Sequence, residues 1–202
     1  MKKSIYTLQV LLLISCISQI SCNDKEETIE PITMLPFTGD IGDYYQGGTV
    51  FYIDSTGIHG LIASVQDLTA KVPWGCYGTV LSAPDGAPAE PIGLGLQNTE
   101  DILRFCLDNV GTAAEISYNL DYNGYGDWFL PSKQELTQMY NNRVLINATA
   151  IANNGKAFEN GGYWSSTGAD PSMYAYVYLF HVDDVGTDRK DALNYVRPVR
   201  AF

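Results

Sequence analysis

The chain has few basic residues and only two histidines. Its 202 residues include 12 Lys+Arg against 23 Asp+Glu, a formal net charge of -11 at pH 7. Binding nucleic-acid phosphates requires a basic surface, so we expect no nucleic-acid partner. His59 and His181 occur without a Gly-x-Ser-x-Gly segment, and zinc-ligand spacings, phosphate-binding loops and nucleotide fingerprints are missing. We therefore expect no catalytic residues, no metal and no cofactor.

Long hydrophobic runs are also missing. The apolar run at residues 10–14, which follows Lys2 and Lys3, is too short to span a bilayer and is typical of a secretion signal. A serine precedes both Cys16 and Cys22, and a small residue before a cysteine is typical of bacterial lipoprotein signals. We expect lipidation at Cys22, because the polar residues 23–27 that follow it suit a solvated tether. Ordinary signal cleavage, with no lipid, is the alternative.

These observations predict three regions. Residues 1–21 form a lipoprotein signal peptide, residues 22–45 form the lipidated cysteine and a tether, and residues 46–202 form one domain. The tail after Cys22 resembles the export signal of surface lipoproteins in the Bacteroidetes, so we expect an outer-membrane lipid anchor with the domain exposed at the cell surface. The membrane is expected to be contacted through the anchor alone.

Two further cysteines, Cys76 and Cys106, lie in the predicted domain. An exported pair meets an oxidising compartment, where a disulfide is favoured. Two buried free thiols are the alternative, because the sequence does not give their separation.

The first and last thirds of the domain favour strands. Residues 49–53 and 58–63 are β-prone and flank the turn-forming residues 54–57, which predicts a hairpin. Residues 163–167, 173–182 and 195–202 are the later strands, and their short connections favour antiparallel pairing.

The middle of the domain favours an irregular region followed by two helices. Glycines and prolines crowd residues 74–97. Thr99 is expected to cap a helix that ends at Gly111, and Ser132 with Glu135 forms a capping box before a second helix. The predicted class is α+β, with a mostly antiparallel sheet and two helices.

One predicted strand alternates aromatic and aliphatic side chains. Tyr174, Tyr176, Tyr178 and Phe180 point to one face, and Ala175, Val177, Leu179 and His181 point to the other. We interpret the aromatic row as core; an exposed aromatic platform for sugars is the alternative.

Several segments in order resemble a known family. They are GGTVFYID (residues 47–54), GIHGLIA (57–63), Trp74-Gly75, GDWFLPS (126–132), YWSST (163–167) and VRPVRAF (196–202). Together they resemble the Lcl C-terminal domain family. The resemblance implies a C-type-lectin-like domain: a twisted, mostly antiparallel sheet, two helices, chain ends brought together and a long irregular region that presents the ligand surface.

The resemblance also implies binding of an external ligand. The best-known member is the terminal domain of a collagen-like bacterial adhesin, which assembles as a trimer and binds sulfated glycosaminoglycans. This chain has no collagen-like repeat and is acidic, so we expect a neutral glycan or a surface protein as ligand and leave the oligomeric state open. The alternative function is a structural subunit of a surface or pilus-like assembly. A glycan-processing enzyme is a less favoured alternative, which stays open because the distance between two carboxylates is not visible in a sequence.

We interpret four residues of the shared segments as scaffold. Trp128 and Trp164 are expected to pin sheet to helix, and Arg197 is expected to pair with a buried carboxylate such as Asp127. The alternative places Trp164 and Arg197 in a pocket.

The candidate ligand contacts lie on outward strand positions, their loops and the irregular region. They are Trp74, Tyr77, Val177, Leu179, His181, Asp183, Asp184, Asp188 and Asn194. Calcium is a minor alternative at residues 121–127 or at Asp183, Asp184 and Asp188, although the EF-hand pattern fails in the first of these.

Overall fold

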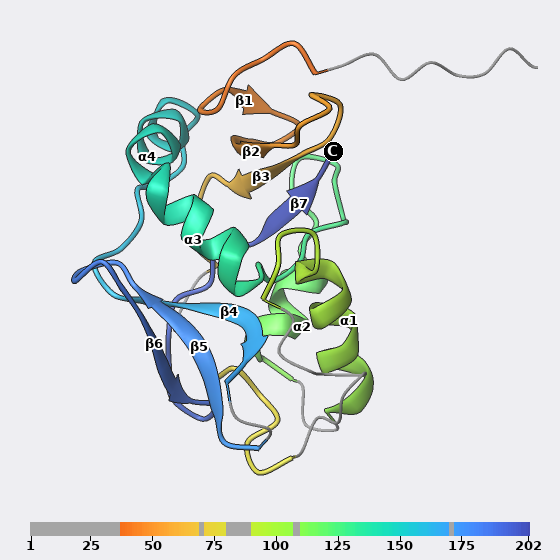
Figure 1. Cartoon of the computed structure of the whole chain (residues 1–202), viewed down its shortest axis with the longest axis vertical. Helices are drawn as coiled ribbons and strands as arrows, with labels where there is room; N and C mark the ends of the chain where they lie inside the picture. Colours follow the sequence, from red (N-terminus) through yellow and green to blue (C-terminus); the bar gives the residue numbers. More distant parts are fainter. Residues whose placement is uncertain (1–36, 69–70, 80–89, 107–109, 170–171) are drawn as a thin grey trace, which may run out of the picture. The chain divides into compact units, whose positions relative to one another are not determined.

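The structure is a computed structural model and describes residues 37–68, 71–79, 90–106, 110–169 and 172–202 (Figure 1). The expected signal peptide at 1–21 and the expected lipidation site Cys22 lie outside these residues. The described elements are β1 (Tyr44–Tyr45), β2 (Gly48–Ile53), β3 (Gly60–Ser64), α1 (Gly95–Phe105), α2 (Ala113–Tyr118), α3 (Lys133–Asn141), α4 (Arg143–Ala152), β4 (Gly162–Gly168), β5 (Tyr174–Leu179), β6 (Asp184–Arg189) and β7 (Val199–Ala201). No helix among the described residues has both the length and the apolar character needed to cross a membrane.

The first sheet has the order β1-β2-β3-β7 and is antiparallel throughout. The expected hairpin is confirmed, with Val50 opposite Ile62 and a turn in which Asp54 accepts hydrogen bonds from Thr56. β7 lies beside β3, so the last strand of the chain adjoins the opening hairpin. Residues 37–45, assigned to the tether in the sequence analysis, contribute β1 and an aromatic contact between Phe37 and Tyr45.

The second sheet has the order β4-β5-β6 and is also antiparallel. The expectation of a single sheet is therefore wrong, because β4 and β5 pair with β6 rather than with the hairpin strands. β6 was not predicted as a strand: its sequence DVGTDR has a glycine and three charged residues and lacks the β-branched alternation that marks buried strands.

Four helices occur in the described residues, where the sequence analysis expected two. The capping box is confirmed, with the Ser132 hydroxyl accepting from the Glu135 amide and the Glu135 carboxylate accepting from the Ser132 amide. α3 ends at Asn141, and Asn142 separates it from α4, so Val144 is exposed rather than in line with the buried face of α3.

The first helix begins four residues before the expected cap. Thr99 lies inside α1, where its buried hydroxyl donates to the Gly95 carbonyl and accepts from the Leu130 amide. α1 ends before Cys106, earlier than the expected end at Gly111.

Buried tryptophans hold these elements together. Trp164 packs with α1 and α2 residues in one cluster and donates its indole N–H to the Val72 carbonyl, 2.8 Å away. Trp128 packs with Val50 and Ile62 of the hairpin.

The predicted α+β class is confirmed. The described residues form two antiparallel sheets, and the helices lie between β3 and β4 in the sequence.

Candidate functional site

The segment before the expected disulfide is held by backbone hydrogen bonds to three parts of the domain. Val72 pairs with Asn194, and the amides of Trp74 and Gly75 both donate to the Lys190 carbonyl. The carbonyl of Pro73 accepts from the Ala113 amide at the start of α2. An irregular segment with satisfied backbone groups presents its side chains from a fixed position.

The segment then turns sharply. Gly75 and Gly78 have positive φ of 100° and 80°, and Cys76, a non-glycine residue, has φ 56°. A Cβ at Gly75 would lie 3.0 Å from the Thr112 side chain, so glycine permits the close approach of α2. Cys76 forms a disulfide with Cys106, at the end of α1, and their Cα atoms are 5.2 Å apart.

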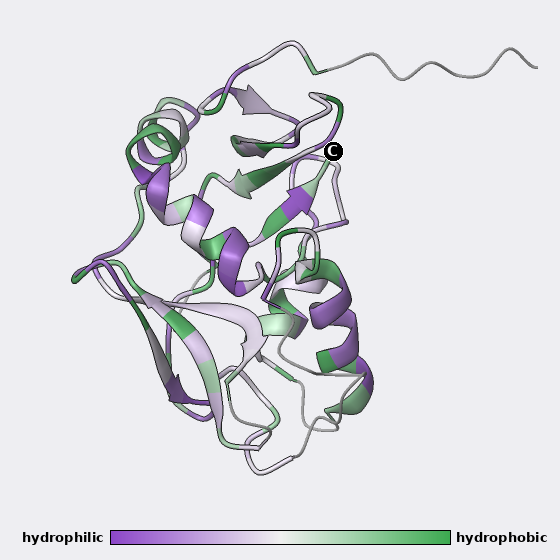
Figure 2. Cartoon of the chain, viewed as in Figure 1, coloured by the Kyte–Doolittle hydropathy of each residue, from purple (hydrophilic) through white to green (hydrophobic). Residues whose placement is uncertain are grey.

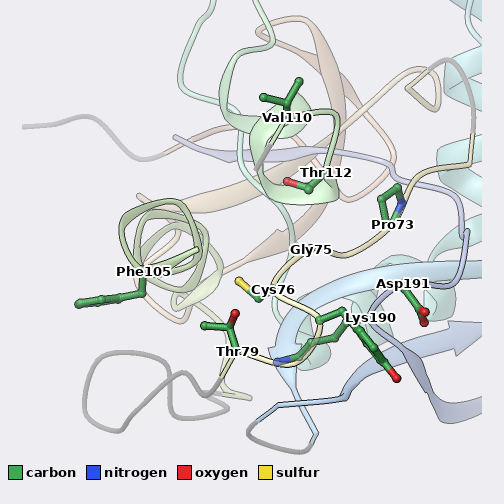
Figure 3. Close-up of a pocket in the computed structure, with 10 residues that line it drawn as sticks. Pro73, Gly75, Cys76, Thr79, Phe105, Val110, Thr112, Lys190 and Asp191 are labelled. Atoms are coloured by element: carbon green, nitrogen blue, oxygen red, sulfur yellow. The ribbon is translucent and has the colours of Figure 1, made fainter. Parts of the chain in front are cut away.

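A pocket of about 400 Å³ lies at this turn (Figure 3). It is lined by Pro73, Gly75, Cys76, Tyr77, Thr79, Phe105, Val110, Thr112, Lys190 and Asp191. Its residues come from the turn, the end of α1, the start of α2 and the segment after β6. The wall mixes an aromatic and aliphatic surface with threonine and tyrosine side chains, which suits a ligand that has both apolar and polar faces.

The charges at the pocket are paired with neighbours. The Arg189 guanidinium lies 4.9 Å from the centre of the Tyr77 ring and forms hydrogen bonds of 2.9 and 2.7 Å with the Asp191 carboxylate. These bonds lower the pKa of Asp191 and raise that of Arg189. Lys190 is buried, with its ammonium 4.7 Å from the Trp74 ring centre. Tyr77 is 40% exposed and its ring is therefore available at the rim.

The expected contact residues divide into buried and exposed ones. Trp74 is 1% exposed and donates its indole N–H to the Ser165 carbonyl at 2.7 Å, so it packs in the core beneath the turn and is not available to a ligand. Val177 and Asn194 are also buried, contrary to the expectation that they point outward. Val177 is on the aliphatic face of β5, which packs against α1 and α2 residues, and Asn194 pairs with Val72. Leu179 is half-buried against the same cluster.

Three other expected contacts lie at the far end of the β5–β6 hairpin. His181, Asp183 and Asp184 are exposed around the turn that joins the two strands. The pocket lies at the opposite end, where Tyr174 pairs with Arg189. Six residues per strand separate the ends by about 20 Å.

Asp188 lies next to Arg189, at the end of the hairpin nearer the pocket. It is half-buried and accepts a hydrogen bond of 3.0 Å from the Asn194 side-chain amide. The structure therefore brings Tyr77 to the pocket rim and leaves the acidic hairpin turn apart from it.

The aromatic row of β5 is buried at one end only. Tyr178 stacks on Tyr140 of α3 with ring centres 4.6 Å apart, and Phe180 packs on Phe158 and Tyr163. Tyr174 is exposed, and Tyr176 is half-buried beneath the Lys133 ammonium. The core interpretation holds for the second half of the row.

Arg197 pairs with a buried carboxylate, as expected, but the choice of Asp127 as that carboxylate is wrong. Asp127 instead accepts two hydrogen bonds of 2.6 Å from Arg200, which lower the pKa of its carboxyl group. Arg197 pairs at 2.6 Å with Asp67, which also accepts from the Tyr163 hydroxyl at 2.7 Å. Burial raises the pKa of both Asp67 and Tyr163.

A second, more polar hollow of about 280 Å³ lies above the Arg197 pair, lined by Gln66, Asp67, Lys156, Glu159 and Tyr195. The Tyr195 ring is covered by Tyr163 on one side and lies near the Lys71 ammonium. Because stacking on Tyr195 is obstructed, we regard the larger pocket as the better binding site.

The two alternative calcium positions depend on how acidic side chains cluster. In the described ranges, no three side chains of His, Cys, Asp or Glu lie close enough to hold a metal ion. Asp127 forms hydrogen bonds with Arg200, and Asp183 accepts a hydrogen bond from the Tyr178 hydroxyl. Burial, together with this hydrogen bond, raises the pKa of Tyr178 to about 12.

Sequence reasoning missed Arg189, the last residue of β6, and Lys190 and Asp191, which follow it. The signal was present as a charged run, DRKD, at residues 188–191. Without the β5–β6 register, nothing placed this run beside Tyr77.

The comparisons with known proteins agree with the resemblance noted above. A family model described as the Lcl C-terminal domain matches residues 65–200, about two thirds of the chain. No curated protein matches the chain. The matched range begins after β3 and includes every residue that lines the pocket.

Proposed function

This chain belongs to the Lcl C-terminal domain family, and we propose that its domain is a non-catalytic, C-type-lectin-like module that binds an external glycan or surface protein. The observation that carries the proposal is the pocket at the disulfide-linked turn, where Tyr77 stands exposed on a rigid base. Binding residues on loops that a scaffold holds in place are a common arrangement.

The volume and chemistry of the pocket favour a small neutral group. About 400 Å³ lies within the usual range for ligand pockets, and the Thr79 hydroxyl lies among the lining residues together with the Phe105 and Tyr77 rings. The neighbouring charges are already paired. A neutral sugar unit or an uncharged peptide side chain therefore fits better than a sulfated polymer, which the acidic chain would repel.

The pocket also favours binding over catalysis. Asp191 is the only carboxylate among the described residues that line the pocket, and Arg189 holds it in an ion pair that lowers its pKa. General acid–base catalysis of glycoside cleavage uses two carboxyl groups in different protonation states. The lining set supplies one.

We further propose that the domain is displayed on a lipid anchor at the cell surface through Cys22. The support is the sequence pattern before and after this cysteine. Cleavage before Cys22 removes two lysines and no acid, so the remaining charge is 10 basic against 23 acidic residues, or -13.

The binding proposal is tested with the full chain in detergent on glycan and protein arrays. We expect a ligand whose affinity falls at least tenfold in Tyr77→Ala, because the exposed ring is lost from the rim. Tyr118→Ala is the matched control: Tyr118 is 42% exposed but does not line the pocket. Equal binding by both variants, or turnover of an oligosaccharide, contradicts the proposal.

The anchor is tested by labelling cells with radioactive palmitate. We expect label in the wild-type protein and in Cys16→Ser, and none in Cys22→Ala. Label retained by Cys22→Ala refutes the choice of cysteine.

A further inference from the structure

Helix α4 presents an apolar face that the described residues leave uncovered. Val144, Leu145 and Ile151 are 72%, 46% and 62% exposed, and Ala148 and Ala152 between them are exposed as well. Positions 144, 148, 151 and 152 fall on one side of a helix. We call these five residues the α4 apolar face. Figure 2 colours much of α4 green, whereas α1 carries broad purple segments.

The opposite side of α4 already packs on the domain. Ile146 and Ala150 are fully buried, and α4 lies against β2. The apolar face is thus an addition to what folding of this helix requires, since one buried stripe is enough to dock it. Exposed apolar residues gathered on one face are typical of an interaction surface.

The charge around α4 differs from that of the rest of the chain. No Asp or Glu occurs between Glu135 and Glu159, although the chain has 23 of them, and the two charged residues in that interval are Arg143 and Lys156. The exposed Asp40 and Asp43 lie on the adjoining segment before β1. The neighbourhood is therefore close to neutral, which suits a zwitterionic lipid surface better than an acidic or a basic partner.

Gly42, in the segment before β1, lies against α4. Gly42 contacts the Leu145 side chain, since a Cβ placed on Gly42 would lie 3.2 Å from it, and its carbonyl accepts from the Thr149 hydroxyl. Residues 23–36 join this region to Cys22, and fourteen residues reach at most about 50 Å however they are arranged. A link of this length lets α4 reach the lipid surface when Cys22 is in a bilayer.

We propose that the α4 apolar face rests on the lipid surface and orients the domain. This inference depends on the lipid anchor proposed above and goes beyond the expectation that the anchor is the only membrane contact. Tethering makes the contact intramolecular, so a weak affinity of the face for lipid is enough to populate it. The pocket is built on α1, α2 and the end of β6, whereas α4 packs on β2, so the contact leaves the pocket open.

The test uses the acylated full chain reconstituted in phosphatidylcholine vesicles that contain brominated lipid. An environment-sensitive fluorophore is attached at Ala148→Cys on the face, or at Thr187→Cys, an exposed position on β6, as the control. We expect bromine to quench the label at position 148 at least twofold more than the label at position 187. Equal quenching at the two positions overturns the proposal.

A second pair of variants separates the face from the anchor. Val144→Ser with Ile151→Ser should reduce quenching at position 148 to the level of position 187, whereas Val182→Ser with Leu193→Ser, at exposed apolar positions elsewhere, should not. Vesicle flotation should be unchanged in both, because the acyl group remains.

Three results overturn the inference. Flotation with no quenching at position 148 overturns the α4 contact and leaves the anchor intact, whereas failure of the wild-type chain to float overturns the anchor and the contact together. Cross-linking between two copies at position 148, without quenching, would show that the α4 apolar face contacts a second copy of the chain instead of lipid. Ligand binding on the arrays is measured separately and is independent of these results.

Discussion

A single arginine, Arg197, supports the interior next to the second sheet. Its guanidinium is buried, donates to Asp67 and to the Ala157 carbonyl, and lies 4.2 Å from the centre of the Phe158 ring. Asp67 receives a second hydrogen bond from Tyr163. A buried charge of this kind depends on its partner far more than a surface charge does.

We expect Arg197→Met to lower the free energy of unfolding by about 3–5 kcal/mol, because methionine fills the space but leaves Asp67 buried without its cation. Arg189→Met is the matched control, since the Arg189–Asp191 pair is exposed to solvent and its loss should change stability much less than the loss of Arg197. Urea unfolding of both variants measures the difference, and similar losses would contradict the argument.

At the scale of residues, the sequence predicted which side chains are buried better than it predicted which residues they contact. The size of Trp128 and Trp164 favoured buried positions, and both are fully buried. The partner of Arg197 was misassigned because Arg197 and Arg200 lie three residues apart near two separate aspartates, and only the register of β7 on β3 decides which carboxylate each one reaches.

At the scale of elements, the start of α3 is joined to the segment before α1. The buried Glu135 carboxylate accepts from the amides of Ser132, Gly93 and Gly95. Burial is the main influence on this group and raises the pKa of its carboxyl group above the ordinary value. A Cβ at Gly95 would lie 2.2 Å from this carboxylate, so glycine is required there.

We expect Glu135→Gln to destabilise the domain by about 1–3 kcal/mol at acidic pH, because the amide replaces one acceptor oxygen by a donor. The pKa of Glu135 in the folded protein is raised. Its contribution to the free energy of unfolding is therefore complete below the ordinary pKa of 4.5 and is lost as the pH rises through the folded pKa. The stability difference between wild type and variant should therefore shrink as pH rises. Denaturant unfolding at several pH values measures it, and a difference that grows with pH contradicts the prediction.

Local signals predicted some elements and missed others. The capping box at Ser132 is a contact between residues three apart, so it was visible in the sequence. The break at Asn142 and the strand β6 were not visible, because α4 begins without a side-chain cap and β6 is recruited by pairing with β5.

At the scale of the whole molecule, the disulfide joins the turn at Cys76 to the end of α1 across 30 residues of chain. We expect Cys76→Ser with Cys106→Ser to lower the free energy of unfolding by about 2–5 kcal/mol, since the open chain gains conformational entropy when unfolded. It should also weaken ligand binding, because Cys76 lines the pocket.

Urea unfolding with and without reductant measures the stability effect. Reduction should bring the wild type to the stability of the double variant and leave the variant unchanged. Reductant sensitivity in the double variant, or none in the wild type, contradicts the prediction.

The sequence by itself determined the features that depend on neighbouring residues: the opening hairpin, the capping box, the α+β class and the family. Tertiary structure alone decided the division into two sheets, the partners of Arg197 and Arg200, and the union of Tyr77 with Lys190 and Asp191 in one pocket. The physical reason is chain separation. A turn or a cap is set by residues a few positions apart, whereas strand register and buried pairing join residues that only the folded core brings together.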